Sequence, residues 1–166
     1  MISSDTLHFT SALDAFKLSP EFLSGENSFA IRNCNSGKTL NVTNGSTSDS
    51  ANIEQYEFDD WASQEWYFEK IDGNYYMIVN KNSGKVLDIS GMSLEENAEC
   101  IQYEYNAGWN QMWEIETDSD GQYKIKNRLS GLYLGILDQS TYDGAWCVQM
   151  ADDGSDNLNW YFLVTE

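Results

Sequence analysis

The stretch NQMW at residues 110–113 ends in a tryptophan, and similar stretches recur at a fixed distance on either side of it. SQEW occupies residues 63–66, and NLNW occupies residues 157–160. The tryptophans Trp66, Trp113 and Trp160 are therefore separated by 47 residues each. Self-similarity at a fixed period is the sequence signature of a repeat architecture, so the whole chain must be compared with itself at this period.

The 47-residue period holds at many other positions without a single gap. The residues shared by all three copies include Ile31, Ile78 and Ile125, the Ser-Gly pairs at 36, 83 and 130, Leu40, Leu87 and Leu134, and Ala51, Ala98 and Ala145. Two further sets are polar, namely Asn33, Asn80 and Asn127, and Gln55, Gln102 and Gln149. We interpret both polar sets as structural hydrogen-bonding residues. The chain therefore contains three copies of one unit, which begin near Phe29, Tyr76 and Tyr123.

Each unit has the pattern of four short strands. It opens with alternating residues, as in YMIVN at 76–80 and YKIKN at 123–127, and continues into a glycine turn such as NSG at 82–84. A strand around Leu87, a third ending near Tyr103 and a fourth that carries the tryptophan complete the unit. Units of this length need a shared core, so we predict one all-β barrel domain over residues 29–166, with repeats 29–75, 76–122 and 123–166. Each tryptophan is expected to anchor its repeat in that core.

The first 28 residues lie outside the repeat. Ser11 is a candidate helix cap, Pro20 marks a second candidate helix start, and apolar residues lie between and after them. We expect either an N-terminal extension of one or two short helical turns on the barrel or a linker to a neighbouring domain.

The charge and the cysteine content of the chain limit the kinds of molecule that it is expected to bind and the chemistry of its core. The chain of 166 residues has 27 acidic and 9 basic residues, a net charge of −18. This charge repels phosphate backbones and anionic lipid surfaces, so neither nucleic acid nor a membrane is an expected partner. The N-terminal residues do not resemble a signal peptide, which suggests either a cytosolic protein or part of a larger secreted one. Among the three cysteines, Cys100 and Cys147 align with Ile53 and are expected to be small buried hydrophobic residues.

Three copies of this length, each closing with Q-x-W or a variant of it, resemble the ricin B-type lectins and the family 13 carbohydrate-binding modules. The resemblance implies a β-trefoil with pseudo-threefold symmetry, without catalytic activity or a cofactor. It also implies binding of glycans that contain galactose, arabinose or xylose. Such modules are commonly attached to secreted glycoside hydrolases, so we expect an extracellular, monomeric domain of a larger protein.

The resemblance also implies one shallow sugar site per repeat, and the second repeat keeps the residues for it. Asp88 matches the aspartate after the second strand, Tyr103 the stacking aromatic, and Asn110 and Gln111 the amide pair before the tryptophan. If Leu87 and Ile89 point into the core, strand alternation turns Asp88 outward to solvent. Gln111 is expected either to contact sugar or to brace the loop, and Trp109 either to form a second wall of the site or to cover the surface.

The other two repeats depart from this pattern. In the first, Asn41 replaces the aspartate while Tyr56 and Gln64 remain, which predicts a weaker second site because a neutral amide makes weaker hydrogen bonds than a carboxylate. In the third, Gly135 and Met150 replace the aspartate and the aromatic, and Leu158 replaces the glutamine, which predicts no site of this kind.

Other functions have less support in the sequence. The acidic stretches at 118–121 and 152–156 lack the glutamate that a calcium loop of the EF-hand type requires, and no metal is expected. Acidic pairs such as Glu95-Glu96 lie in loops that look exposed, whereas a glycosidase needs two carboxyl groups flanking a cleft. A trefoil that serves as a protein-interaction module, such as an inhibitor or a toxin-associated subunit, is the main alternative to sugar binding.

Overall fold

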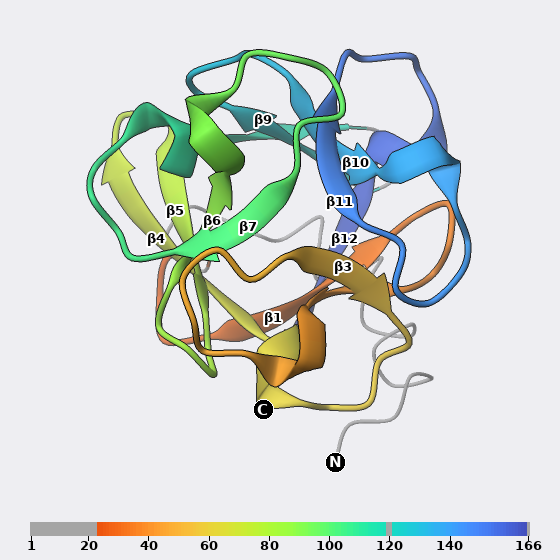
Figure 1. Ribbon diagram of the computed structural model, residues 1–166, viewed down its shortest axis with the longest axis horizontal. Helices are drawn as coiled ribbons and strands as arrows, with labels where there is room; N and C mark the ends of the chain where they lie inside the picture. Colours follow the sequence, from red (N-terminus) through yellow and green to blue (C-terminus); the bar gives the residue numbers. More distant parts are fainter. Residues whose placement is uncertain (1–22, 119–120, 166) are drawn as a thin grey trace.

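The computed structural model describes residues 23–118 and 121–165, which form a single sheet of twelve strands (Figure 1). The strands are β1 (Ser28–Asn33), β2 (Thr39–Val42), β3 (Ile53–Tyr56), β4 (Trp66–Asp72), β5 (Tyr75–Asn80), β6 (Val86–Ile89), β7 (Cys100–Tyr103), β8 (Trp113–Thr117), β9 (Tyr123–Asn127), β10 (Tyr133–Ile136), β11 (Cys147–Met150) and β12 (Trp160–Thr165). Each repeat contributes four of them, and the fourth strand of each repeat begins at its tryptophan.

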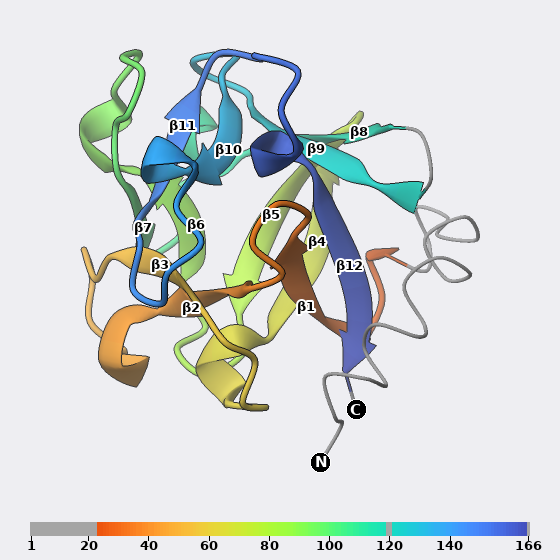
Figure 2. The same ribbon diagram turned by 90° about the vertical axis from the view of Figure 1, so that its right-hand side faces the viewer.

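Six strands close into a barrel. Strand β1 pairs antiparallel with β12 and β4, β5 pairs with β4 and β8, and β9 pairs with β8 and β12. The other six strands form the hairpins β2–β3, β6–β7 and β10–β11. Figure 2 shows these hairpins together at one end of the barrel. Because a closed ring has no free edge strand, the barrel offers no template for pairing with another chain.

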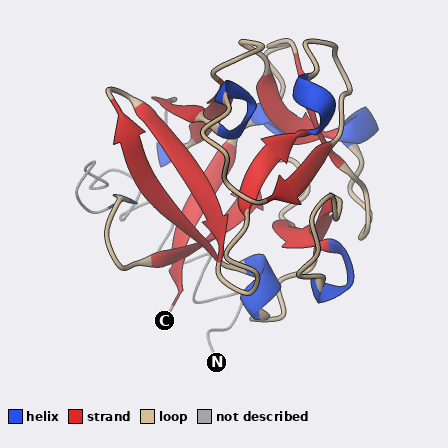
Figure 3. Ribbon diagram, turned by 60° about the vertical axis from the view of Figure 1, so that its left-hand side comes forward, coloured by secondary structure: helices blue, strands red, loops and turns tan. Residues whose placement is uncertain are grey.

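This architecture is the predicted β-trefoil. Short 3₁₀ turns follow the second strand and precede the fourth strand of each repeat, and Figure 3 shows them between the strands. They are η1 (Thr43–Gly45), η2 (Ala62–Gln64), η3 (Ser90–Met92), η4 (Trp109–Gln111), η6 (Leu137–Gln139) and η7 (Asp156–Leu158). All but the last residue of the helical turns predicted for the N-terminal extension lie within residues 1–22, outside the described residues. The last one, Leu23, is buried in the shared core.

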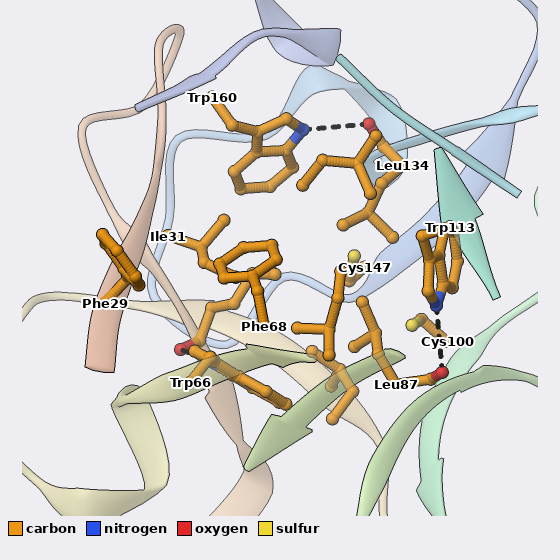
Figure 4. Packing of buried hydrophobic residues seen from close by; sticks show 14 of the residues in the cluster. Phe29, Ile31, Trp66, Phe68, Leu87, Cys100, Trp113, Leu134, Cys147 and Trp160 are labelled. Carbon is orange, nitrogen blue, oxygen red and sulfur yellow. Dashed lines mark hydrogen bonds between the residues drawn. The ribbon is translucent and has the colours of Figure 1, made fainter. Parts of the chain in front are cut away.

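The three tryptophans lie completely buried in one shared core (Figure 4). Each indole N–H donates a hydrogen bond to a leucine carbonyl oxygen of its own repeat, at 3.2 Å for Trp66 and 3.1 Å for both Trp113 and Trp160. The acceptors are Leu40, Leu87 and Leu134. Each indole therefore joins the first residue of the barrel strand to the hairpin strand of the same repeat. The predicted anchoring of each tryptophan in a shared core is confirmed.

The three identical glutamines connect neighbouring repeats. Gln102 donates from Nε2 to the carbonyl oxygens of Ser46 and Ser48, which belong to the first repeat. Gln149 bonds Ser93 and Glu95 of the second repeat in the same way, and Gln55 bonds Ser140 and Tyr142 of the third. The predicted structural role is confirmed, and the arrangement is cyclic, since each repeat holds a loop of the preceding repeat and the first repeat holds a loop of the third.

The identical asparagines support the hairpins that join the first two strands of each repeat. Asn80 Oδ1 accepts hydrogen bonds from the backbone N–H groups of Asn82 and Ser83, and its Nδ2 donates to the Ser63 carbonyl oxygen. The turn then passes through Gly84 at a φ of +74°, a conformation that favours glycine. Asn33 and Asn127 make the equivalent contacts, which confirms the predicted role.

The cysteines behave as predicted. All three are free, and Cys100 and Cys147 are completely buried in the shared core, where Ile53 takes the third equivalent position. Burial raises the pKa of the Cys100 thiol well above its usual range. The Cys100 thiol therefore contributes to packing in the protonated form.

Substitution of Trp113 by phenylalanine should lower the free energy of unfolding by about 2–4 kcal/mol, because it removes a buried hydrogen bond to Leu87 and leaves part of the indole volume empty. Urea denaturation followed by circular dichroism measures this change. Trp109→Phe is the matched control: the Trp109 side chain is 52% exposed, so the same chemical change should cost less than about 1 kcal/mol. Equal costs at both positions would contradict the anchoring role of Trp113.

Candidate functional site

The predicted site of the second repeat lies on the outer face of the hairpin β6–β7. Leu87 and Ile89 are completely buried in the core, so alternation along β6 turns Asp88 to the opposite face. In the register of the hairpin, Asp88 lies opposite Ile101, and Val86 lies opposite Tyr103. Asp88 and Tyr103 therefore share one face, two positions apart along the strands. The Tyr103 side chain is 38% exposed and available to a ligand.

Asp88 itself is not exposed to solvent, and the prediction on this point was wrong. The residue retains only 4% of its accessible surface because two amides of η4 cover it. Asn110 Nδ2 donates to one carboxylate oxygen at 3.0 Å, and Gln111 Nε2 donates to the other at 2.9 Å. The carboxylate is thus buried beneath these two amides, whereas Tyr103 on the same face of the hairpin is exposed.

The structure favours the bracing role for Gln111. This side chain is completely buried, and its Oε1 accepts a hydrogen bond from the Asn106 backbone N–H. Its Nε2 donates to the Glu104 carbonyl oxygen as well as to Asp88. Gln111 therefore positions both the carboxylate and the loop that follows β7. Asn110 also has a second bond, from Nδ2 to the Ile89 carbonyl oxygen, which fixes it against β6.

Burial changes the acid–base behaviour of the site. Desolvation raises the pKa of Asp88 from its ordinary value to about 6, against the opposing effect of the hydrogen bonds from Gln111 and Asn110. At neutral pH the carboxylate is mostly ionised. A charged, partly desolvated acceptor makes stronger hydrogen bonds than a neutral one, so hydroxyl groups are the complementary donors for it.

Trp109 has one stacking partner already. The Arg128 guanidinium lies 4.1 Å from the centroid of the Trp109 ring and 4.2 Å from that of Tyr75. Arg128 comes from the hairpin turn of the third repeat, so this contact fastens the rim of the second-repeat site to its neighbour. The remaining exposed surface of Trp109 keeps open the prediction that the ring forms a second wall.

The first repeat has a pocket of about 490 Å³. Its lining consists of Asn41, Asn44, Gly45, Glu54, Tyr56, Trp61, Ala62, Ser63 and Asn82. Of the three residues predicted for this repeat, Asn41 and Tyr56 line the pocket, whereas Gln64 is completely buried and bonds the loop through Glu57 and Asp59. The sequence interpretation missed Glu54. The sequence does mark this position, because the 47-residue alignment pairs the charged Glu54 with the apolar residues Ile101 and Val148.

In the third repeat, neighbouring side chains fill the position of the missing aspartate. A Cβ atom on Gly135 would lie 2.7 Å from Leu158 Cδ2, 3.1 Å from Met150 Sδ and 3.2 Å from Asn157 Nδ2. Met150 and Leu158 replace the aromatic residue and the glutamine of the pattern, and their side chains occupy the space beside Gly135. Trp146 and Asp138, which lie nearby in sequence, line two different pockets and do not converge.

Other kinds of site have no geometric support in the described part of the chain. Residues 23–118 and 121–165 contain no group of three or more His, Cys, Asp or Glu side chains that could hold a metal ion. The acidic pairs Glu95-Glu96 and Asp152-Asp153 are exposed, as predicted. None of the helical turns in these residues has the length and apolar character needed to cross a membrane.

Comparison with known proteins places this geometry in a family. A family model described as a ricin-type beta-trefoil lectin domain-like domain matches residues 15–103 and 109–166. Among solved structures, the designed threefold-symmetric protein ThreeFoil is 38% identical, with a TM-score of 0.81 over 82% of this chain and 97% of that chain. The exo-β-1,3-galactanase 1,3Gal43A from Clostridium thermocellum is 36% identical, with a TM-score of 0.84 over 87% of this chain and 32% of that chain.

A more distant structure shares the fold. The ricin B-like lectin of Macrolepiota procera, solved in complex with lactose, is 18% identical, with a TM-score of 0.72 over 84% of this chain and 95% of that chain. The search of curated proteins gave no match. The family model covers most of the chain, and the chain therefore belongs to the ricin-type β-trefoil lectin domain-like family.

Proposed function

We propose that this chain is a non-catalytic carbohydrate-binding module that recognises galactosyl, arabinosyl or xylosyl glycans through its second repeat. The observation that supports this function is the Asp88 carboxylate, which accepts hydrogen bonds from Asn110 and Gln111 and lies on the face that carries the exposed Tyr103. A carboxylate accepts hydrogen bonds from adjacent sugar hydroxyl groups, while an aromatic ring covers the apolar C–H face of a pyranose. The two groups together match one edge and one face of a sugar ring.

The biological setting follows from the same interpretation. This chain aligns with 32% of the galactanase chain, which is the proportion expected of one domain in a larger enzyme. We place the module in an extracellular protein, where it would hold an attached glycoside hydrolase domain on its polysaccharide. The strongly negative charge suits a neutral polysaccharide better than an anionic one, since like charges repel.

Replacement of Asp88 by alanine should weaken binding of β-1,3-galactobiose, arabinobiose or xylotriose about 10- to 100-fold, the value of one or two hydrogen bonds to a charged group. The fold should survive, because Asn110 Nδ2 keeps the Ile89 carbonyl and Gln111 Nε2 keeps the Glu104 carbonyl as acceptors. Isothermal titration calorimetry measures the affinity, and the Tyr103 ring resonances report contact with the sugar.

Asp72→Ala is the control for this experiment, since it removes an exposed carboxylate at the end of β4. Its affinity should equal that of the unaltered chain. Undiminished sugar binding by Asp88→Ala at the second repeat would contradict the proposed site. Failure of the unaltered chain to bind any saccharide on a broad glycan array would contradict the proposed function, and a protein partner insensitive to sugar would then favour an interaction module.

Acidification should weaken binding at the second repeat. The pKa of Asp88 is about 6, so at pH 5 only about one molecule in ten carries the ionised acceptor. The affinity should therefore fall about tenfold between pH 7 and pH 5, with the midpoint of the change near pH 6. Calorimetric titrations across this range, together with an NMR titration of the Asp88 carboxyl carbon, measure both quantities. An affinity that stays constant from pH 7 to pH 5 would show that the ionised carboxylate is not the acceptor.

A further inference from the structure

Two of the three cysteines lie at equivalent positions of neighbouring repeats. Cys147 follows Cys100 by one period of 47 residues, and Ile53 takes the equivalent position in the first repeat. All three side chains are completely buried in the shared core (Figure 4). Because the first repeat supplies an isoleucine where the other two supply cysteines, the described core brings together one pair of thiols.

The register between repeats places these two cysteines directly opposite each other. An isolated antiparallel bridge joins Glu99, the residue before β7, to Val148 in β11. The next pair in this antiparallel register is Cys100 with Cys147. Successive residues of a strand point to opposite faces, so both cysteines turn away from the exposed Glu99 and into the core. The two thiols therefore face the same interior space from adjacent strands of different repeats.

The separation of opposed strands suits a disulfide bond. Directly opposite residues of an antiparallel pair have Cα atoms about 4.5–5.5 Å apart, and disulfides span Cα separations of about 4.4–6.8 Å. A hydrogen bond of 3.1 Å from the Gln149 backbone N–H to the Ala98 carbonyl oxygen holds the strands together beside the cysteines. The Cys147 thiol also lies within hydrogen-bonding reach of the Cys100 thiol. An S–S bond at this position therefore requires no rearrangement of the strands.

The third cysteine lies apart from this pair. Cys34 follows β1 in the hairpin turn of the first repeat, is only partly buried and does not belong to the core cluster. Its backbone N–H donates to the Asn159 carbonyl oxygen at 2.9 Å, which fixes it against the third repeat, outside the core cluster. Three cysteines allow three different pairings, and the fold brings together the partners of one of them.

From this geometry we infer that Cys100 and Cys147 form a disulfide bond between the second and third repeats when the chain folds with a disulfide oxidant such as glutathione disulfide. Two protons and two electrons pass from the cysteines to the oxidant as the new S–S bond forms. The S–S bond of the oxidant breaks, and its two sulfur atoms leave as thiols. The inference does not depend on sugar binding. The extracellular setting proposed above is one in which such bonds persist.

The bond forms during folding, before the core closes. In the folded chain, desolvation and the neighbouring Cys147 thiol raise the pKa of the Cys100 thiol well above its usual range, and only a thiolate attacks a disulfide. Both side chains are also completely closed to solvent. The folded, reduced chain should therefore react slowly with the oxidant. The folded, oxidised chain should resist a reductant for the same reason until it unfolds.

The test refolds the reduced, urea-unfolded chain in a buffer of reduced and oxidised glutathione, blocks the remaining thiols with iodoacetamide and digests the product with trypsin. Cleavage after lysine and arginine leaves Cys34, Cys100 and Cys147 in the separate peptides 33–38, 86–124 and 129–166. Mass spectrometry should find peptide 86–124 joined to peptide 129–166, with Cys34 bonded to neither. Alkylation of all three cysteines, or a bond from Cys34 to either of the others, would overturn the inference.

The cross-link should also raise the midpoint of thermal unfolding, because a disulfide that spans a whole repeat restricts the unfolded chain. Circular dichroism should give a midpoint about 5–15 °C higher for the oxidised chain than for the chain refolded with dithiothreitol. Cys147→Ala should abolish this difference, whereas Cys34→Ala, the matched control, should retain it. If Cys147→Ala does not fold, the unaltered chain and Cys34→Ala still decide the question. Equal midpoints for their oxidised and reduced forms would contradict a bond that the folded core accommodates.

Discussion

The structure depends on three buried indole hydrogen bonds. Each repeat is too short to enclose a core, so its apolar side chains are covered only when three repeats share one interior. The tryptophans fix how that sharing occurs, because each indole spans from the start of a barrel strand to a leucine carbonyl in the hairpin of its repeat. The hairpin is thereby held at the same distance from the barrel in all three repeats. The outer faces of the three hairpins therefore take equivalent positions.

The outer faces of the hairpins differ between repeats, whereas the buried pair of leucine and tryptophan is the same in all three. On the same hairpin frame, the second repeat carries Asp88 opposite Ile101, the first carries Asn41 opposite Glu54, and the third carries Gly135 opposite Val148. None of these exchanges alters the buried leucine or tryptophan of its repeat. The same hairpin backbone thus carries a carboxylate on its first strand in the second repeat and on its second strand in the first repeat. In the third repeat it carries a glycine, beside which Leu158 occupies the side-chain space.

The features that recur in all three repeats were predictable from the sequence. The features that differ between repeats were predictable only in part. The period alone predicts the twelve strands, the buried tryptophans and the roles of the identical glutamines and asparagines. Strand alternation placed Asp88 on the correct face, but it could not show that Asn110 and Gln111 would cover the carboxylate. Glu54 was missed because its partnership with Asn41 is a matter of register between strands. Once the hairpin is known, both residues belong to one pocket.

The cyclic glutamine contacts have a consequence for how such a chain can change over time. Gln149 of the third repeat holds Ser93 and Glu95, in the loop that follows β6 beside the second-repeat site. The third repeat, which lacks the aspartate and the aromatic residue of the pattern, thus still holds a loop of its neighbour in place. Mutation can therefore erase recognition in one copy without making that copy dispensable. A gene that arose by triplication can in this way keep three repeats while the set of ligands that they bind becomes smaller or changes.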